Sequence, residues 1–430
     1  MPRRVNKDTT WFKLDNAAKI YPVLKSSKDS FVFRISVIVK EIVKPEVLQQ
    51  ALLDLTQRFP HMFVRIKHGF FWYYLEANSK KPIVRPEPSL VNQRIDTQAN
   101  NHFFFSVFYY QNRISLESFH ALCDGAGAIE FVKSLVFRYF ELRGHEMKND
   151  GTVLTVDQYP KPEEMEDSFA KYADKSGANR EKVIPAFHIK AKKFIYSESR
   201  GVITARLPAE SLIPIAKKHG VTVTQYLVAL LTYSIHETYI GQIPEKRPIR
   251  ISVPVNMRRY HPSISLRNFS QYIHTTVYSS KKLTFEEVLL KIKQDFETEI
   301  KPETFQGSIN ANVYAEKNPF VRILPLFIKK MLLSIIGTRL GARLETATLS
   351  NVGIITLPES LTPWVDRFEF NLATAAQAVY GVGVGTYNGL TTISFLRSIY
   401  DTNVERRFFT TLATAGAEVT VESNFWEEKA

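Results

Sequence analysis

One strand-to-helix junction constrains the fold of this chain more than any other stretch. Residues 113–119 are bulky and strand-forming, and beyond residue 128 apolar side chains recur at helical spacing. These helical positions are Ile129, Val132, Leu135, Val136, Tyr139 and Phe140. Only residues 120–127, His-Ala-Leu-Cys-Asp-Gly-Ala-Gly, separate the two patterns. The junction therefore predicts an α/β fold in which a helix directly follows a strand of a mixed sheet.

Strand and helix patterns also alternate along the rest of the chain. Before the junction, the sequence predicts strands at 31–39 and 103–110 and a helix at 45–58. Later runs of β-branched and aromatic residues predict strands at 201–207, 249–255, 271–278, 349–353 and 391–399. Apolar periodicity predicts helices at 209–219, 225–239, 284–298 and 404–412. The glycine alternation at 381–385, followed by Tyr-Asn-Gly, predicts a hairpin rather than a phosphate-binding loop.

A polar stretch with several prolines and many charged residues divides these patterns into two parts. The chain of 430 residues is also too long for one simple core. We therefore expect an N-terminal α/β half over residues 1–150, a connector over 151–195, and a C-terminal α/β half over 196–430.

The composition of the chain limits which cellular compartment and which binding partners we expect. The single cysteine, Cys123, excludes an intramolecular disulfide and gives no support for a cysteine-based metal site. The chain begins with polar and basic residues rather than a secretory signal, so we expect a cytoplasmic protein. A net charge of +13 favours an anionic partner. Because the basic residues are scattered and form no known nucleic-acid-binding pattern, we expect a phosphorylated cofactor or an acidic carrier protein rather than nucleic acid.

Residues 321–340 form the most apolar stretch of the chain. Charged residues and a proline interrupt it, at Arg322, Pro325, Lys329, Lys330 and Arg339. This is not the pattern of a membrane span. Two interpretations remain, a helix packed on its own domain or a helix that makes a peripheral contact with a membrane surface.

Within the junction, His120 is the side chain best suited to proton transfer. A neutral imidazole there can accept the proton of a hydroxyl or amine as that group attacks a carbonyl. Asp124 can either orient His120, as in a catalytic triad, or pair with an arginine and fix the loop. A His-x-x-x-Asp metal site would need further ligands that the sequence does not supply nearby. Cys123, next to Leu122, is more typical of a buried thiol than of a nucleophile.

Residues 120–125 resemble the His-x-x-x-Asp-Gly motif of coenzyme A-dependent acyltransferases of the chloramphenicol acetyltransferase-like superfamily. This superfamily includes alcohol acetyltransferases, wax ester synthases, polyketide-associated acyltransferases and the condensation domains of nonribosomal peptide synthetases. Three later blocks are similar to family blocks in the same order: Ser-Val-Pro-Val-Asn-Met-Arg at 252–258, Asn-Phe at 268–269, and Ser-Asn-Val-Gly at 350–353. The segment 14–22 resembles the alcohol acetyltransferase branch. The resemblance therefore covers nearly the whole chain.

Two features depart from the family pattern. Many relatives carry a second histidine directly before the catalytic one, and this chain has Phe119 there. The histidine that is retained, His120, is the one usually given the chemistry. The Asp-Phe-Gly-Trp-Gly motif of the plant branch is absent from the sequence, which argues against that branch.

The resemblance implies a pseudo-dimer of two chloramphenicol acetyltransferase-like halves, each a mixed sheet with helices, with the active-site tunnel between them. His120 would be the general base, and Asp124 would belong to the catalytic motif chiefly as a structural partner of Arg258. Arg258 can equally be a surface charge beside its neighbouring arginine. The candidates for holding the developing oxyanion are Gly125, Asn256, Ser350 and Asn351.

The expected activity is transfer of an acyl group from an acyl-coenzyme A or carrier-protein thioester to an alcohol or amine, without a covalent acyl-enzyme. Acyl-coenzyme A would be a co-substrate, and the resemblance implies no tightly bound cofactor and no metal. The alternative is a condensation-like module without activity that binds an acyl carrier protein or another partner.

Overall fold

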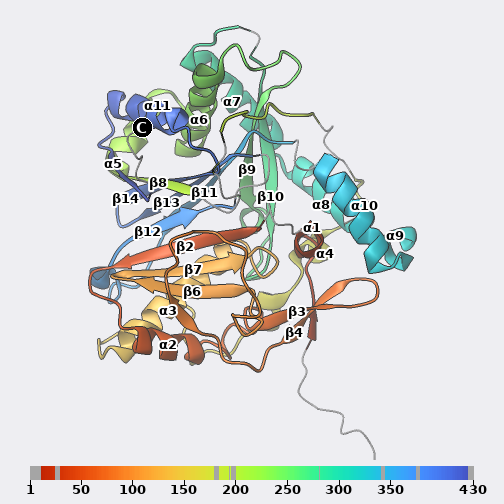
Figure 1. The fold of residues 1–430 in the computed structure, drawn as a ribbon, viewed down its shortest axis with the longest axis vertical. Helices are drawn as coiled ribbons and strands as arrows, with labels where there is room; N and C mark the ends of the chain where they lie inside the picture. The colour runs from red at the N-terminus through yellow and green to blue at the C-terminus, as the bar shows by residue number, and fades with distance from the viewer. Residues whose placement is uncertain are drawn as a thin grey trace, which may run out of the picture.

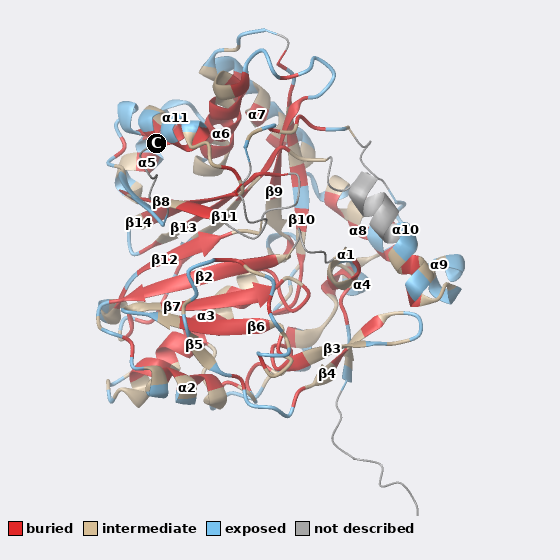
Figure 2. Cartoon of the chain, in the orientation of Figure 1, coloured by how far each residue is buried: buried red, intermediate tan, exposed pale blue. Residues whose placement is uncertain are grey.

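Two large sheets, one above the other, form the body of the molecule in this computed structural model (Figure 1). The structure describes residues 11–24, 30–178, 184–192, 194, 200–279, 281–339, 344–373 and 378–424. Buried side chains follow the strands of both sheets and the helices that pack on them (Figure 2). The layers therefore bury a separate core in each half of the molecule.

The N-terminal sheet carries the strand-to-helix junction. In spatial order its strands are β12 (Val365–Asn371), β2 (Val32–Val39), β7 (Arg113–Phe119), β6 (Phe105–Tyr110) and β5 (Val84–Pro86). Its outer face is covered by α2 (Pro45–Asp54) and α3 (Gly125–Leu142). The predicted strands at 31–39, 103–110 and 113–119 are present to within two residues. The helix predicted at 45–58 is four residues too long, because residues 55–58 form a turn.

The C-terminal sheet is larger. In spatial order its strands are β10 (Ser270–Val277), β9 (Ile249–Asn256), β11 (Ala347–Ile355), β13 (Tyr380–Tyr387), β14 (Leu390–Arg397), β8 (Gly201–Pro208) and β15 (Thr420–Ser423). The helices near it are α5 (Ala209–Lys218), α6 (Val223–Tyr239), α7 (Phe285–Glu299) and α11 (Asn403–Thr414). Thr222 caps α6 through a reciprocal pair with Gln225, which fixes the start of this largely buried helix.

Strand β12 joins the two halves. Its sequence neighbours, β11 and β13, pair in parallel within the C-terminal sheet, but β12 itself pairs antiparallel with β2 of the N-terminal sheet. Asn371 lies opposite Arg34 in this register, and Phe370 lies opposite Ile35. The N-terminal sheet is therefore completed by a strand from the C-terminal half.

The glycine alternation in β13 has a steric role. β13 and β14 form the predicted hairpin, with Asn388 and Gly389 at the turn. A Cβ on Gly383 would lie 2.2 Å from the carbonyl oxygen of Phe370, and one on Gly385 would lie 2.5 Å from its ring. Glycine is therefore required at both positions, because β12 crosses β13 too closely for any side chain.

A small sheet and a group of helices flank the two halves. The sheet consists of β1 (Trp11–Lys13), β4 (Tyr73–Ala77) and β3 (Val64–His68). The helices are α1 (Tyr21–Leu24), α4 (Ser168–Tyr172), α8 (Pro302–Lys317), α9 (Pro319–Ile323) and α10 (Leu326–Arg339). Short 3-10 helices lie at Ala18–Ile20, Pro162–Met165, Met257–Arg259 and Thr362–Trp364.

Within the apolar stretch 321–340, residues 321–323 belong to α9 and residues 326–339 to α10, with Pro325 at the break, and residue 340 lies outside the described residues. Within the part of the chain that the structure describes, no helix combines the length and the apolar character needed to cross a bilayer.

The polar connector is anchored at a buried ion pair. Glu164 accepts two hydrogen bonds from the guanidinium of Arg58, at 2.6 and 2.9 Å, and both side chains are almost fully buried. The backbone carbonyl of Glu164 also accepts a hydrogen bond from the amide of Leu266 in the C-terminal half. This part of the connector is therefore fixed between the two halves rather than loose.

Candidate functional site

His120 lies directly after the last residue of β7. Its backbone amide donates to the carbonyl of Phe31 at 2.9 Å, which holds the turn against the start of β2. The imidazole ring is stacked on Tyr21, with ring centres 5.0 Å apart, and contacts Phe33 at 4.8 Å. The side chain stays partly exposed. Two aromatic rings thus hold the imidazole in place without closing it off from solvent.

Asn268, from the C-terminal half, determines which nitrogen of His120 carries the proton. The amide nitrogen of Asn268 donates to the carbonyl of His120 at 3.0 Å and to the carboxylate of Asp15 at 3.3 Å. Both partners are acceptors, so the orientation of this amide is fixed. Its oxygen then faces Nδ1 of His120 at 3.4 Å, which assigns the proton to Nδ1. Nε2 is left with its lone pair and can accept a proton.

The surroundings of His120 also keep the ring neutral. Burial lowers the pKa of His120 from its ordinary value of 6.5. The hydrogen bond with Asn268 and the charges of Asp124 and Asp15 act in the opposite direction but are outweighed. At neutral pH the imidazole is therefore present in the form that a general base requires.

Asp124 is buried and has several hydrogen-bond donors around it. Its carboxylate caps α3 by accepting from the amide of Gly127 at 3.1 Å. It also accepts from Arg258 at 2.8 and 3.3 Å, from the amide of Phe269 at 2.8 Å and from the hydroxyl of Ser270 at 3.0 Å. Burial alone would raise the pKa of Asp124, but Arg258 and the amide donors hold it below its ordinary value. The structure thus places Arg258 on Asp124, as the resemblance implies.

Of the two glycines at the start of α3, Gly127 is the one that allows the two halves to approach closely. A Cβ on Gly127 would lie 1.9 Å from the carbonyl oxygen of Leu266, which no side chain can tolerate. A Cβ on Gly125 would lie 3.9 Å from Val352, at an ordinary contact distance. The first turn of α3 is therefore packed against the segment that leads to Asn268, and close to β11.

The remaining candidate residues lie on the strands that face this turn. The side-chain oxygen of Asn256 accepts from the backbone and the guanidinium of Arg258, at 3.1 and 3.2 Å, and so supports the ion pair. The side chain of Asn351 donates to Thr224 at 3.0 Å and accepts from the amide of Gly353 at 2.9 Å. Ser350 pairs with Gly383 across β11 and β13. Among the described residues, Asn256, Asn351 and Ser350 make no hydrogen bond to His120.

Two alternative chemistries receive no support from the geometry. Burial raises the pKa of the Cys123 thiol to about 12, and the residue has no exposed surface. A metal at His120 and Asp124 would have to compete with Arg258 for the carboxylate. Across the described ranges, no group of three histidine, cysteine or acidic side chains is arranged to hold a metal ion.

Sequence reasoning missed the residues that position the base. Asp15 accepts from the amide of Ala18 at 2.7 Å and lies 3.3 Å from Arg267, so it links the N-terminal segment to Asn268. Tyr21 provides the stacking surface. Both residues belong to the segment 14–22 that resembles the alcohol acetyltransferase branch, and Asn268 belongs to the block at 268–269. The resemblance identifies both blocks, but no local sequence pattern places them beside His120.

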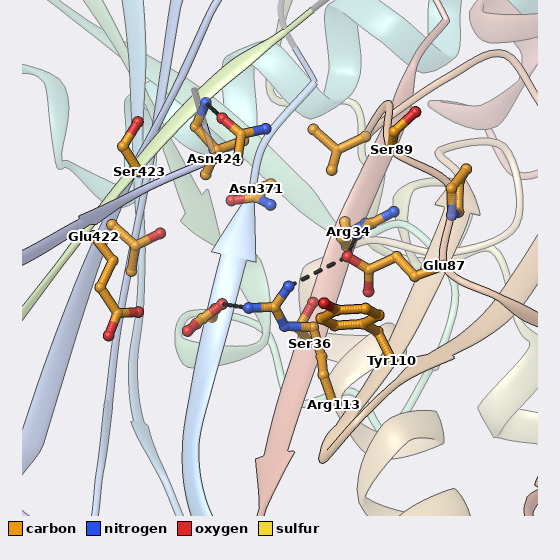
Figure 3. A pocket seen from close by; sticks show the side chains of 15 residues that line it. Arg34, Ser36, Glu87, Ser89, Tyr110, Arg113, Asn371, Glu422, Ser423 and Asn424 are labelled. Carbon is orange, nitrogen blue, oxygen red and sulfur yellow. Dashed lines mark hydrogen bonds and ion pairs between the residues drawn. The ribbon is translucent and has the colours of Figure 1, made fainter. Parts of the chain in front are cut away.

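A polar cavity of about 460 Å³ lies elsewhere between the halves (Figure 3). Arg34 on its wall is almost fully buried and contacts Glu87 and Glu117, each at 2.8 Å. Arg113 joins Glu87 to Glu369, and Glu422 enters from the opposite sheet. His120 does not line this cavity. The tunnel to His120 that the resemblance implies stays a prediction.

Comparison with known proteins gives a clear answer only for the fold. No protein-family model matches the chain, and no curated protein matches its sequence. The TRI3 trichothecene 15-O-acetyltransferase from Fusarium sporotrichioides superposes with a TM-score of 0.60 at 11% identity, over 95% of this chain and 94% of its own. TRI101 of F. sporotrichioides, complexed with coenzyme A and T-2, gives 0.60 at 12%, over 95% and 99%. The first condensation domain of the CDA synthetase gives 0.57 at 13%, over 94% and 96%.

These likenesses confirm the predicted fold class over nearly the whole chain. The mixed sheets and helices are arranged as in an acetyltransferase and a condensation domain. At such low identity, the likeness describes the fold and not the activity.

Proposed function

We propose that this protein is an acyltransferase that moves an acyl group from the thioester of coenzyme A, or of a carrier protein, to an alcohol or amine. The observation that carries the proposal is the orientation of His120. Asn268 holds the proton on Nδ1, and burial keeps the ring neutral, so Nε2 is available as a base in a partly exposed position. The fold shared with an acetyltransferase supports the same reaction class.

In the proposed reaction, Nε2 of His120 takes the proton from the attacking hydroxyl or amine. The oxygen or nitrogen then forms a bond to the thioester carbonyl carbon, and the carbonyl oxygen gains negative charge. When the tetrahedral intermediate collapses, the carbon–sulfur bond breaks and the imidazolium returns its proton to the departing thiolate. His120 thus acts first as a base and then as an acid, and no acyl-enzyme is formed.

The developing oxyanion needs a hydrogen-bond donor beside the base. The start of α3 offers the backbone amides of Gly125 and Ala126, which precede the first helical acceptor, whereas the amide of Gly127 is already bound by Asp124; the helix dipole favours negative charge there. Asp124 and Arg258 would fix this turn and would not take part in proton transfer. The side chains of Asn256 and Asn351 are engaged in structural hydrogen bonds, which makes the backbone the better candidate.

Release of free thiol tests the proposal. The purified protein is supplied with acetyl-, octanoyl- and palmitoyl-coenzyme A and with a panel of primary alcohols and amines, and the products are identified by mass spectrometry. We expect transfer with at least one pair and a loss of about 10²- to 10⁴-fold in His120→Ala, because general base catalysis contributes that range.

His219→Ala is the matched control, since His219 is exposed at the end of α5. It should retain full activity. Turnover that survives in a folded His120→Ala protein would refute the proposed base. A protein that binds acyl-coenzyme A but transfers to no acceptor would instead favour the binding-module alternative.

A further inference from the structure

Exposed apolar side chains gather where the loop between β3 and β4 meets α9 and α10. We call this surface the apolar edge, and its members are Phe70, Phe71, Phe320, Ile323, Phe327 and Met331. Their exposed fractions are 71%, 44%, 83%, 70%, 70% and 58%. Both segments project from the same side of the molecule (Figure 1). Large apolar side chains are rarely concentrated in this way on the surface of a protein that meets only water.

Hydrogen bonds join the two segments of the apolar edge to each other. The amide of Leu326 donates to the carbonyl of Phe70 at 2.9 Å, and the Leu326 side chain belongs to the buried core. The ammonium of Lys329 donates to the carbonyl of Phe71 at 2.9 Å and lies 4.0 Å from the centre of the Trp72 ring. These contacts hold α10 to the loop while the phenyl rings point away from the core.

The charged side chains on the segments that carry the apolar edge are cationic, and the nearest acidic residues in the sequence, Glu76 and Glu316, are each paired with a cation. Neither residues 317–344 nor residues 55–75 include an aspartate or glutamate. The exposed cations are Lys317 and Arg322, and the half-exposed Lys67 lies on β3. Apolar side chains beside cationic ones are typical of segments that lie in the interface of an anionic bilayer.

We propose that the apolar edge is a membrane-binding surface that inserts its phenyl rings into the interface of a bilayer containing anionic lipid. α10 has 14 residues and is about 21 Å long, too short to cross the apolar core of a bilayer, so the contact is peripheral. A second copy of the chain fits less well, because it would bring like charges together. An acidic partner protein would need a groove on its own surface to receive the rings, because the rings lie on segments that protrude from this protein.

The location of the edge connects it with the candidate site. α10 contacts α1, and α1 carries Tyr21, whose ring is stacked on His120. A bilayer held at the apolar edge would therefore be connected to the proposed base through α10 and α1. The membrane-binding proposal does not depend on the proposed reaction.

Vesicle flotation tests the proposal with the full-length protein. The vesicles consist of phosphatidylcholine alone or of phosphatidylcholine mixed with phosphatidylglycerol. We expect binding to the mixed vesicles, weaker binding to phosphatidylcholine, and release by added salt, since salt screens the cationic contribution. The triple variant Phe70→Ser, Phe320→Ser, Phe327→Ser should bind the mixed vesicles more weakly than the unchanged protein, by a factor of about ten at least.

The control is Ile42→Ser with Ile354→Ser, which removes apolar side chains that are 68% and 79% exposed at other positions. This control should bind as the unchanged protein does. All five substituted positions are exposed, and melting temperatures verify that the variants are folded. The proposal is overturned if the unchanged protein does not float with mixed vesicles, or if the triple variant floats equally well. Self-association that the triple variant abolishes, without vesicle binding, would assign the edge to a second copy.

Discussion

The proton on His120 is positioned by a side chain 148 residues away along the chain. Asn268 accepts from Nδ1, and its own amide hydrogens are committed to His120 and Asp15. A rotated Asn268 would lose both of those bonds, so these two acceptors fix the tautomer of His120. At this scale, the base is a property of both halves and not of the junction alone.

The pH dependence of the reaction should follow the lowered pKa of His120. The neutral form is the active one, so the rate falls only when the pH drops through the folded-state pKa, which burial places below 6.5. We expect the acid limb of the kcat/KM profile to have its midpoint below 6.5. In Asn268→Ala the midpoint should move to still lower pH, because that hydrogen bond raises the pKa. A midpoint above 6.5 in the unchanged protein would contradict this environment.

Asp124 should matter more for stability than for proton transfer. Asp124→Asn removes the charge that balances Arg258, whose side chain is 14% exposed, and should cost about 3–5 kcal/mol of unfolding free energy. The folded pKa lies below the ordinary value of 3.8, so this stability is present above about pH 3.8 and lost as the pH falls through the folded pKa. Urea unfolding at neutral and acidic pH measures both effects.

The control for this variant is Glu146→Gln. Glu146 and its partner Lys148 are each 80% exposed, so the substitution should leave the unfolding midpoint unchanged. If Asp124→Asn unfolds like the unchanged protein but has lost its activity, Asp124 would be a direct participant in catalysis.

Gly125 and Gly127, at the start of α3, should respond differently to replacement by alanine. In Gly127→Ala the new methyl group would meet the Leu266 carbonyl at 1.9 Å, and backbone must move, at a cost of about 1–3 kcal/mol. In Gly125→Ala the contact is 3.9 Å, so stability should be unchanged or slightly raised by the better helix former. Thermal unfolding of the two variants compares the same substitution two residues apart. Equal losses in both variants would contradict the steric explanation.

Elements with a long apolar pattern were predictable from the sequence, including β2 despite its buried and ion-paired Arg34, whereas the short and heavily charged β12 was not. β2 and α6 lie where their apolar patterns place them. β12 received no prediction, because Arg367 and Glu369 interrupt its apolar residues. In the structure these two side chains pair at 2.9 Å and are nearly buried. The sequence alone does not show that these two charges pair and become buried, so the segment could not be recognised as a strand.

The same limit applies to the candidate site. His120 and Asp124 were found because the motif places them in one short turn. Asp15 and Tyr21 meet His120 only through the packing of the N-terminal segment, which no local pattern encodes. Sequence reasoning therefore identified the reacting group but not the side chains that set its protonation and orientation.

At the scale of the whole molecule, β12 makes the halves depend on each other. It pairs with β2 at six positions, and its backbone lies against Gly383 of β13. Asp124 and Arg258 add a buried ion pair between the halves, and Arg58 and Glu164 fix the connector. The N-terminal sheet loses its edge strand β12 if the C-terminal half unfolds, and the two ion pairs are lost if the halves separate. We therefore expect one cooperative unfolding transition rather than two.

Two probes that report on different halves can test this coupling. Trp11, Trp72 and Trp364 lie on or beside the N-terminal half, and Trp364 is stacked on Phe140. With Trp426 replaced by Phe, fluorescence follows that half, whereas far-UV circular dichroism is weighted toward the helices of the C-terminal half. The two urea curves should coincide.

In Gly383→Val the new side chain would force β12 from β13, since even a Cβ would lie 2.2 Å from the Phe370 carbonyl, and the curves should separate. Separate curves in the unchanged protein would show that β12 does not couple the halves.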